Sequence, residues 1–141
     1  MWHMNRASPT HLNPKKRYLH VALNSTLEEA QHIIRDIPVS DRILVEAGTP
    51  FIKRYGGYGI KKMYGWYAEH VGSNAIPPYI VADLKTMDRG EAEVDIAARA
   101  GASAAVALGH TPTETLNAFV EECNNRGLDV SREWGSTSQV D

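Results

Sequence analysis

Cysteine is almost missing from this sequence of 141 residues, which contains Cys123 and no other. An internal disulfide needs two thiols, so disulfide bonding within the chain is excluded. Cys123 falls at an apolar position of a helical pattern, which predicts a small buried side chain rather than a nucleophile.

Long apolar runs and an excess of one charge are also missing. No run approaches the roughly 18 residues that a membrane-spanning helix needs, and the N-terminus lacks the apolar core of a signal peptide. We therefore expect no membrane span, no secretion and a cytoplasmic protein. The net charge is −2 with acidic and basic residues interspersed, so the basic surface typical of nucleic-acid binding is not indicated. Nucleic acid is not an expected partner.

The length and the 43% hydrophobic content are those of one globular domain with a sizeable core. Its two ends do not belong to the predicted fold. Residues 1–17 show no periodicity, and we expect a disordered leader or an expression remnant, with His3 and His11 exposed to solvent. Residues 131–141 also lack apolar periodicity and are expected to be a disordered tail. The folded domain is predicted to span residues 18–130.

Short apolar strands alternate with amphipathic helices between these ends. Strands are predicted at Tyr18–Leu23, Arg42–Glu46, Tyr79–Ala82 and Ala104–Leu108, with the start of a fifth at Leu128–Val130. This alternation predicts an α/β fold with a parallel sheet joined by right-handed crossovers.

The helices between the strands carry recognisable ends. Capping boxes are predicted at Ser25–Glu28 and at Thr111–Glu114, and glycines at Gly101 and Gly127 are expected to end two helices. The helix over residues 90–100 is expected to bury Ala92, Ile96, Ala97 and Ala100.

The segment Phe51–Pro78 is less regular, because glycines interrupt a run rich in tyrosine and tryptophan. A helix is predicted over Ile60–His70 within it. The aromatic side chains fit either a ligand platform or packing and subunit contact, and we favour packing or contact.

Residues 79–88 join a buried strand to three charged side chains. Strand alternation sends Asp83 and Lys85 to the same face, and Asp88 follows on the next turn. One interpretation is a surface ion pair followed by a helix cap at Asp88. The other is a functional cluster, in which neighbouring charges perturb one another's pKa values.

The other predicted strands also end in polar residues. Asn24, Glu46 and His110 follow the first, second and fourth strands. Ligands collect at the carboxyl ends of the strands in parallel sheets, so this shared rim favours the functional interpretation. Asn24 and His110 are therefore candidates for substrate contact, although a polar turn explains His110 equally well.

Four segments carry a family resemblance: Val21–Asn24, Val45–Pro50, Val81–Asp88 and Ala98–Gly101. They resemble the orotidine 5′-phosphate decarboxylase superfamily, and most closely its 3-hexulose-6-phosphate synthase branch, over about residues 18–130. The resemblance is specific, because a D-x-K-x-x-D pattern follows the third strand and a G-T-P turn follows the second. It implies a TIM-barrel type (β/α) fold, of which this chain would form a half-barrel of about four βα units.

The resemblance also implies chemistry. Glu46 and Asp83 would hold Mg²⁺, which prefers such hard oxygen ligands. Lys85 would stabilise an enediolate, and Asp88 would reach into the site of a neighbouring subunit of a homodimer or larger oligomer. The implied enzyme is an aldehyde-lyase that adds formaldehyde to the sugar phosphate ribulose 5-phosphate, giving a hexulose phosphate. The orotidine 5′-phosphate decarboxylases carry lysine where this chain has Glu46, so that activity is disfavoured.

Three departures from the family pattern lead to an alternative. Asn24 stands where the family has aspartate, and the segment between Glu46 and Asp83 is longer than usual. The resemblance also covers only the first half of the barrel, whereas phosphate is commonly bound by loops after strands seven and eight. Open edges at the first and fourth strands predict that self-association completes or covers the half-barrel. The alternative is therefore a catalytically silent, self-associating fragment.

Overall fold

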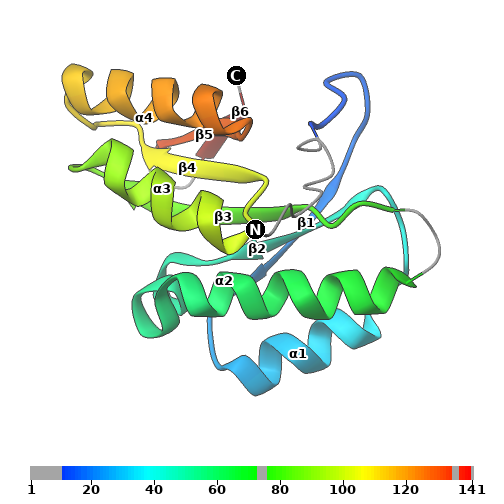
Figure 1. Ribbon diagram of the computed structural model, residues 1–141. Helices are drawn as coiled ribbons and strands as arrows, with labels where there is room; N and C mark the ends of the chain where they lie inside the picture. Colours follow the sequence, from blue (N-terminus) through cyan, green and yellow to red (C-terminus); the bar gives the residue numbers. More distant parts are fainter. Residues whose placement is uncertain (1–10, 73–75, 135–136, 141) are drawn as a thin grey trace, which may run out of the picture.

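The computed structural model describes residues 11–72, 76–134 and 137–140, in which strands and helices alternate as far as β5 (Figure 1). The strands are β1 Leu19–Leu23, β2 Ile43–Ala47, β3 Ile80–Thr86, β4 Ala104–Leu108, β5 Asp129–Trp134 and β6 Thr137–Val140. The helices are α1 Leu27–Asp36, α2 Thr49–Val71, α3 Gly90–Ala100 and α4 Thr113–Arg126.

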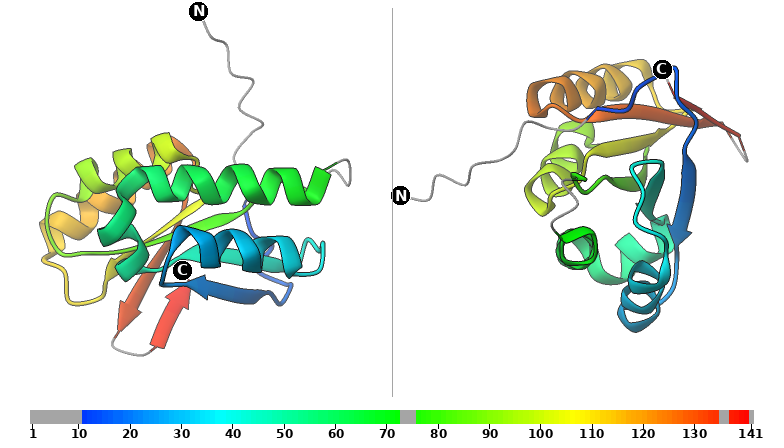
Figure 2. Two further views of the ribbon diagram at one scale, coloured as in Figure 1. Left: turned by 90° about the horizontal axis from the view of Figure 1, so that it is seen from below. Right: turned by 90° about the vertical axis from the view of Figure 1, so that its right-hand side faces the viewer.

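The strands form one sheet in the order β1-β2-β3-β4-β5-β6. Strands β1 to β5 run parallel, and β6 runs antiparallel to β5. All four helices lie on one side of the curved sheet, as the right-hand view of Figure 2 shows. The predicted α/β sheet with four βα units is confirmed.

Strands β2 to β4, in the middle of the sheet, are buried on both faces, as expected for parallel strands. Alternate residues of β2 to β4 face the helices in the larger core, among them Val45, Ala47, Ile80, Ala82 and Ala105. The opposite face carries a smaller apolar cluster of Leu44, Tyr79, Val81, Ala104 and Val106, against which Leu12 and Tyr18 pack. Side chains at the carboxyl end of this second face therefore lie next to this apolar cluster.

The segment before β1 is held to β5 by Asp129. One carboxylate oxygen of Asp129 lies 2.7 Å from Nδ1 of His11, and the other accepts hydrogen bonds from the backbone N–H of Leu12 at 3.1 Å and the hydroxyl of Tyr79 at 2.6 Å. His11 is exposed as expected, by 58% of its side chain, but it is also in contact with the fold through Asp129. His3 lies outside the described residues.

Two predicted capping boxes differ from the structure. In α1 the hydroxyl of Thr26 accepts a hydrogen bond from the N–H of Glu29 at 3.1 Å, so the cap lies one residue later than predicted. At α4 the predicted box does not form, because Thr111 is buried and its hydroxyl lies within hydrogen-bond distance of the carbonyls of Thr86 and Leu108, which share its single proton. The buried carbonyls outcompete the helix end for this hydroxyl.

Helix α2 begins at Thr49, well before the predicted start at Ile60. Gly56 has φ 61° and ψ −151°, a backbone conformation that is open to glycine and kinks the helix. At Gly59 an added Cβ atom would lie 2.6 Å from the Phe51 ring, so the glycine allows close packing inside the helix. Buried apolar contacts, with Phe51 the largest, offset the low helix propensity of the glycines.

The aromatic side chains of α2 pack within the molecule in several places. The hydroxyl of Tyr67 donates to the carbonyl of Ile43 at 3.1 Å, and the hydroxyl of Tyr55 accepts from the N–H of Leu27 at 3.2 Å. These contacts join α2 to β2 and α1, which agrees with the favoured packing interpretation.

Helix α3 has the predicted bounds but a different buried face. Val94, Ala97 and Ala98 are buried, whereas Ala92 and Ile96 are exposed, the latter by 50%. The helix is therefore rotated relative to the prediction, because Val94 opens an i, i+3, i+4 stripe that faces the sheet. Gly101 and Gly127 end α3 and α4 with φ values of 101° and 71°, as predicted.

The segment from Ser131 has regular structure where a tail was expected. Residues 131–134 continue β5, whose register with β4 runs from Ala104↔Asp129 to Leu108↔Glu133. Strand β6 then pairs with β5. The expectation of an open edge at the fourth strand was therefore wrong, because β5 pairs with β4 over its whole length and satisfies the backbone groups that an edge would expose.

Cys123 is buried in α4 as predicted, and burial raises the pKa of its thiol to about 12. The thiolate that a nucleophile requires is thus disfavoured at neutral pH. In the described part of the chain, no helix combines the length and apolar character needed to cross a membrane.

Candidate active site

Glu46 and Asp83 project from neighbouring strands toward the same face of the sheet. Glu46 of β2 is in register with Val81 of β3, and Asp83 follows Val81 by two residues, which returns its side chain to that face. Strand rise and spacing put the two Cα atoms roughly 8 Å apart. This is the face of the smaller apolar cluster, to which Val81 belongs.

Strand β3 widens into a bulge just beyond this pairing. The register with β4 passes from Ala82↔Ala105 to Thr86↔Ala107, so that residues 83–85 lie opposite the single residue 106. Within the bulge, Lys85 has φ 46°, in the left-handed region that residues other than glycine rarely adopt. Bulges redirect side chains, and strained backbone of this kind concentrates at functional sites.

The side chain of Lys85 contacts both Asp83 and Thr49. Its Nζ lies 2.5 Å from Oδ2 of Asp83 and 3.2 Å from Oγ1 of Thr49. The ion pair is sheltered, since the side chains of Lys85 and Asp83 are 36% and 10% exposed. The predicted proximity of Asp83 and Lys85 is confirmed. Thr49 was not predicted as a site residue, and its place in the G-T-P turn was the only signal in the sequence.

Oδ1, the second carboxylate oxygen of Asp83, is buried and has no hydrogen-bond partner among the described residues. A buried polar atom left in this state costs roughly 1–3 kcal/mol. Such an atom calls for an explanation, and a carboxylate oxygen has the chemistry of a cation ligand.

Glu46 lies on the same face, level with Val81 and beside His20 of β1. Its side chain is 19% exposed, and its Oε1 is 3.9 Å from Nδ1 of His20. Burial lowers the pKa of His20 below its ordinary value, which favours the neutral imidazole. His20 was not considered in the sequence analysis, although strand alternation places it on the same face as Glu46.

Asn24 follows β1 at the same edge and packs against the turn after β2. A Cβ atom added to Gly48 would lie 1.7 Å from Oδ1 of Asn24, so the asparagine side chain occupies the space that any larger residue would need. The N–H of Gly48 also donates to the carbonyl of Leu23 at 2.9 Å. Asn24 thus belongs to the rim, next to the start of α2.

Asp88 and His110 lie in the turns after β3 and β4, and both are exposed. The carboxylate of Asp88 accepts a hydrogen bond from the N–H of Arg89 at 2.8 Å. The N-cap of α3 is Arg89 with φ 56°, so Asp88 is not the helix cap of the simpler interpretation. Both residues occupy the predicted edge, but the direct contacts of the site involve Thr49, Asp83 and Lys85.

At the carboxyl ends of β2 and β3, the site offers a cation two carboxylates, those of Glu46 and Asp83. No group of three or more histidine, cysteine, aspartate or glutamate side chains suited to a metal ion occurs in the described residues. Glu46 and Asp83 are carboxylates that the sheet places on one face at this edge. Mg²⁺ is commonly held by one or two carboxylates while water and substrate oxygens complete its shell, so the pair fits this ion.

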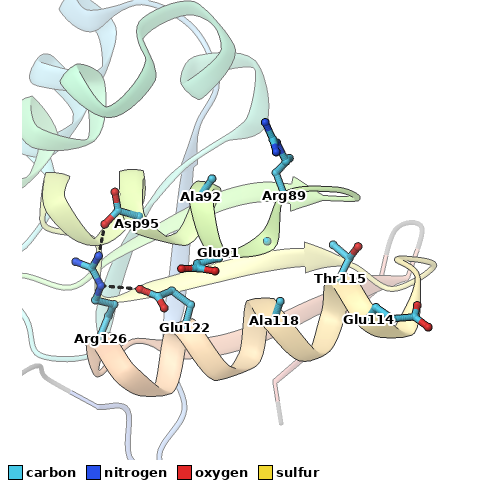
Figure 3. Close-up of a pocket in the computed structure, with 10 residues that line it drawn as sticks. Arg89, Glu91, Ala92, Asp95, Glu114, Thr115, Ala118, Glu122 and Arg126 are labelled. Atoms are coloured by element: carbon cyan, nitrogen blue, oxygen red, sulfur yellow. Dashed lines mark hydrogen bonds and ion pairs between the residues drawn. The ribbon is translucent and has the colours of Figure 1, made fainter.

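A separate groove of about 530 Å³ lies between α3 and α4 (Figure 3). Gly90 brings the helices close, since a Cβ atom there would lie 2.8 Å from the carbonyl oxygen of Thr115. Acidic side chains, including Glu91 and Glu114, line the groove. Neither Glu46, Asp83 nor Lys85 is among its lining residues, so the groove is distinct from the rim.

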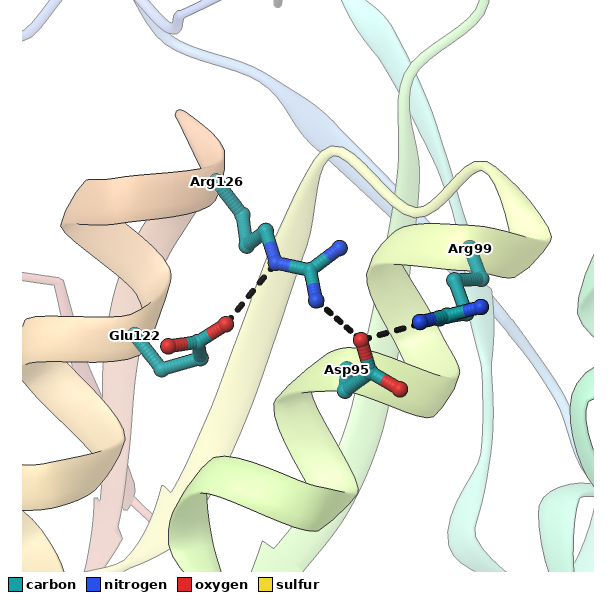
Figure 4. A network of polar contacts seen from close by, with 4 residues as sticks. All are labelled: Asp95, Arg99, Glu122 and Arg126. Carbon is teal, nitrogen blue, oxygen red and sulfur yellow. Dashed lines mark hydrogen bonds and ion pairs between the residues drawn. The ribbon is translucent and has the colours of Figure 1, made fainter.

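At one end of this groove, one ion pair joins the two helices and is flanked by an ion pair within each helix (Figure 4). Arg126 of α4 contacts Asp95 of α3 and donates to Glu122 at 2.8 Å, and Arg99 donates to Asp95 at 2.9 Å. The hydrogen bond from Arg99, with the charges of both guanidinium groups, lowers the pKa of Asp95. The network ties α3 to α4, which accounts for these charges without a ligand.

A family model, curated proteins and solved structures that resemble this chain point to the same family. Residues 17–138 match the orotidine 5′-phosphate decarboxylase / HUMPS family. A bifunctional enzyme Fae/Hps from Methanococcoides burtonii is 43% identical over 112 residues, which are 79% of this chain and 26% of that protein. The chain therefore spans about a quarter of the length of the curated relatives it matches.

Solved structures share the fold. The 3-hexulose-6-phosphate synthase from Salmonella typhimurium superposes with a TM-score of 0.70 and 30% identity, over 83% of this chain and 52% of that one. The 3-keto-L-gulonate-6-phosphate decarboxylase from Vibrio cholerae has a TM-score of 0.72 and 21% identity, over 86% of this chain and 53% of that one. The five parallel strands with their helices thus correspond to part of a TIM-barrel-like fold. The chain belongs to the orotidine 5′-phosphate decarboxylase / HUMPS family.

Proposed function

We propose that this chain carries the cation-binding and charge-stabilising part of an aldehyde-lyase site of the 3-hexulose-6-phosphate synthase type. The observation that carries the proposal is the Lys85–Asp83 contact, next to a buried carboxylate oxygen without a partner and on the same face as Glu46. Relatives named Fae/Hps and a synthase structure at 30% identity support this branch. Because the chain spans 52% of that structure, the complete activity is part of the proposal.

The proposed reaction is an aldol addition of formaldehyde to ribulose 5-phosphate. A proton leaves C1 of the sugar phosphate, C1 bonds to the formaldehyde carbon, and the former aldehyde oxygen takes up a proton. Every atom of the two substrates is retained in the hexulose phosphate, and no oxidant or reductant is needed. The site must therefore stabilise negative charge on the sugar oxygens while C1 reacts.

Glu46 and Asp83 are the proposed ligands of Mg²⁺. The unpartnered Oδ1 of Asp83 supports this assignment, because it is an oxygen that the described side chains leave without a donor. A bound Mg²⁺ would supply Lewis-acid polarisation of the substrate oxygens. With only two carboxylates, the protein would leave coordination positions for water and substrate.

Lys85 is the proposed source of positive charge from the protein. Its ammonium group is held at 2.5 Å from Asp83, in a sheltered position where a fixed charge acts more strongly than in water. It would donate a hydrogen bond to the sugar oxygen on which negative charge develops.

Substrate contacts and assembly are further parts of the proposal. Asn24 would contact the sugar phosphate from the start of the rim, and His110 from the turn after β4. Asp88, exposed beyond β3, would reach a neighbouring subunit's site in a homo-oligomer. Light scattering coupled to size-exclusion chromatography tests the assembly, and a monodisperse monomer at micromolar concentration would refute it.

Formaldehyde-dependent consumption of ribulose 5-phosphate tests the activity. We expect turnover that needs Mg²⁺ and is lost in Glu46→Gln and Lys85→Ala. The controls Glu121→Gln and Lys61→Ala change exposed residues of α4 and α2 and should keep wild-type rates. Unchanged rates in Glu46→Gln or Lys85→Ala would contradict the proposal.

Calorimetric titration distinguishes this function from a silent assembly fragment. Heat from Mg²⁺ and sugar phosphate binding is expected for the proposed site. Absence of both heat and turnover, together with an oligomer in light scattering, would favour the fragment.

A further inference from the structure

We propose that Thr49 is a positioning residue, which holds the ammonium group of Lys85 in one direction and stabilises the bulge of β3. Its effect on turnover rests on the proposed function, whereas its effect on the conformation of Lys85 does not. Thr49 is the first residue of α2 and comes from the turn after β2, so it reaches the bulge from the neighbouring strand.

The hydroxyl of Thr49 makes two hydrogen bonds, one as donor and one as acceptor. It donates to the backbone carbonyl of Asp83 at 2.7 Å and accepts from Nζ of Lys85 at 3.2 Å. A hydroxyl has one proton and two lone pairs, so donation to the carbonyl leaves a lone pair for the ammonium group. The two bonds therefore fix each other's direction.

The hydrogen bond from Thr49 to the carbonyl of Asp83 lies at the bulge of β3. Residues 83–85 lie opposite one residue of β4, so regular ladder pairing is interrupted there. On the other side of β3, the ladder with β2 ends at Ala47↔Ala82, so the carbonyl of Asp83 needs another donor, which Thr49 supplies. The left-handed backbone at Lys85 costs roughly 1–2 kcal/mol, so interactions around the bulge must offset that strain.

The second bond restricts a flexible side chain. Lysine has four rotatable carbon–carbon bonds, and its ammonium group needs more than one anchor to keep a single position. Asp83 and Thr49 provide anchors from two different elements. Thr49 is itself stiff because β-branching limits its rotamers. The preceding Gly48 is bonded to the carbonyl of Leu23, which ties the turn to β1.

Substitution of Thr49 by valine and by serine separates the hydroxyl from the shape of the side chain. Thr49→Val keeps the branched shape and removes both hydrogen bonds, whereas Thr49→Ser keeps the hydroxyl. Thr113→Val is the matched control, because Thr113 is the first residue of α4 and is exposed. Circular dichroism of each variant verifies that it folds.

The structural measurement is solution NMR of the whole chain. The backbone ¹³C shifts of Lys85 report its left-handed conformation, and its side-chain ¹⁵N signal reports a fixed ammonium group. We expect Thr49→Val to shift or broaden both, and Thr49→Ser and Thr113→Val to leave them near wild type. Unchanged Lys85 signals in folded Thr49→Val would overturn the proposal.

The kinetic measurement is the formaldehyde-dependent assay. We expect Thr49→Val to lower kcat about 10- to 100-fold, the size of a lost hydrogen bond to a charged group, with little change in KM. Thr49→Ser should recover most of the rate. Equal kcat in Thr49→Val and wild type would overturn the positioning role. If wild type shows no turnover, the proposed function fails, and the NMR result alone still decides for or against Thr49.

Discussion

The ammonium nitrogen of Lys85 lies 2.5 Å from a carboxylate oxygen of Asp83, two positions earlier on the same strand. The contact forms inside a bulge in which Lys85 has φ 46°. Backbone strain and an ion pair thus occur together at the carboxyl end of β3, the edge where parallel α/β proteins bind ligands. The combination predicts that Lys85 contributes to function at a cost in stability.

Replacing Lys85 by glycine and by alanine tests this cost. Both variants lose the ammonium group, but glycine adopts φ 46° without the strain that alanine retains. We expect Lys85→Gly to exceed Lys85→Ala in free energy of unfolding by about 1 kcal/mol, and both to be inactive. Urea denaturation measures the difference, and an alanine variant as stable as the glycine variant would show that the backbone is not strained.

Gly48 should tolerate no side chain, because Asn24 fills the adjacent space. An added Cβ atom would lie 1.7 Å from Oδ1 of Asn24 and 3.0 Å from the carbonyl of Leu23. We expect Gly48→Ala to lose about 1–3 kcal/mol, as overpacking does. The control Gly65→Ala, in α2, meets no atom within 4 Å and should gain about 0.5–1 kcal/mol.

A double variant identifies the residue that causes this clash. Asn24→Ala removes the overlapping side chain, so Asn24→Ala with Gly48→Ala should be less destabilised than the sum of the single changes. If the losses in thermal unfolding are additive, the cost of Gly48→Ala does not come from the side chain of Asn24.

The free energy of unfolding should fall at alkaline pH because of the hydroxyl of Tyr79. Burial, followed by the hydrogen bond to Asp129 and the charge of that residue, raises the pKa of Tyr79 above its ordinary value of 10.0. The native state therefore keeps a proton that the unfolded chain loses above about pH 10, and stability falls as the pH rises beyond that point.

Replacing Tyr79 by phenylalanine tests this dependence. Tyr79→Phe should cost about 1.5–3 kcal/mol at neutral pH, where it removes a hydrogen bond to a carboxylate. Above pH 10 its stability should fall less steeply than that of wild type, by up to about 1.4 kcal/mol per pH unit. Tyr58→Phe, at a tyrosine 60% exposed, is the control and should follow wild type. Parallel pH profiles for Tyr79→Phe and wild type would contradict the prediction.

Much of the fold was predictable because the apolar runs are short and sharply bounded. The strand Ala104–Leu108 has its predicted bounds, and Gly101 and Gly127 end their helices as expected. The buried face of α3 was not predictable, because Ile96 and Val94 are both apolar and only the packing decides between them. Strand β6 was not predictable either, since it depends on pairing with β5 and not on its own pattern.

The site was predictable as a set of positions but not as a geometry. Asp83 and Lys85 lie together as strand alternation predicted, and the parallel register puts Glu46 on the face of Asp83. The bulge, the positive φ of Lys85 and the contact with Thr49 have no signature in composition or periodicity. The roles of all six residues, Asn24, Glu46, Asp83, Lys85, Asp88 and His110, stay predictions.

Paramagnetic NMR can show whether Glu46 and Asp83 share one divalent cation, as we propose. Mn²⁺ prefers the same oxygen ligands as Mg²⁺ and broadens the signals of nearby nuclei. With Mn²⁺ below one equivalent, we predict that the amide signals of Glu46 and Asp83 broaden first, that excess Mg²⁺ restores them, and that Asp83→Asn abolishes the effect. Broadening that instead begins at the acidic groove between α3 and α4, or that is unchanged in Asp83→Asn, would show that Glu46 and Asp83 do not share the ion.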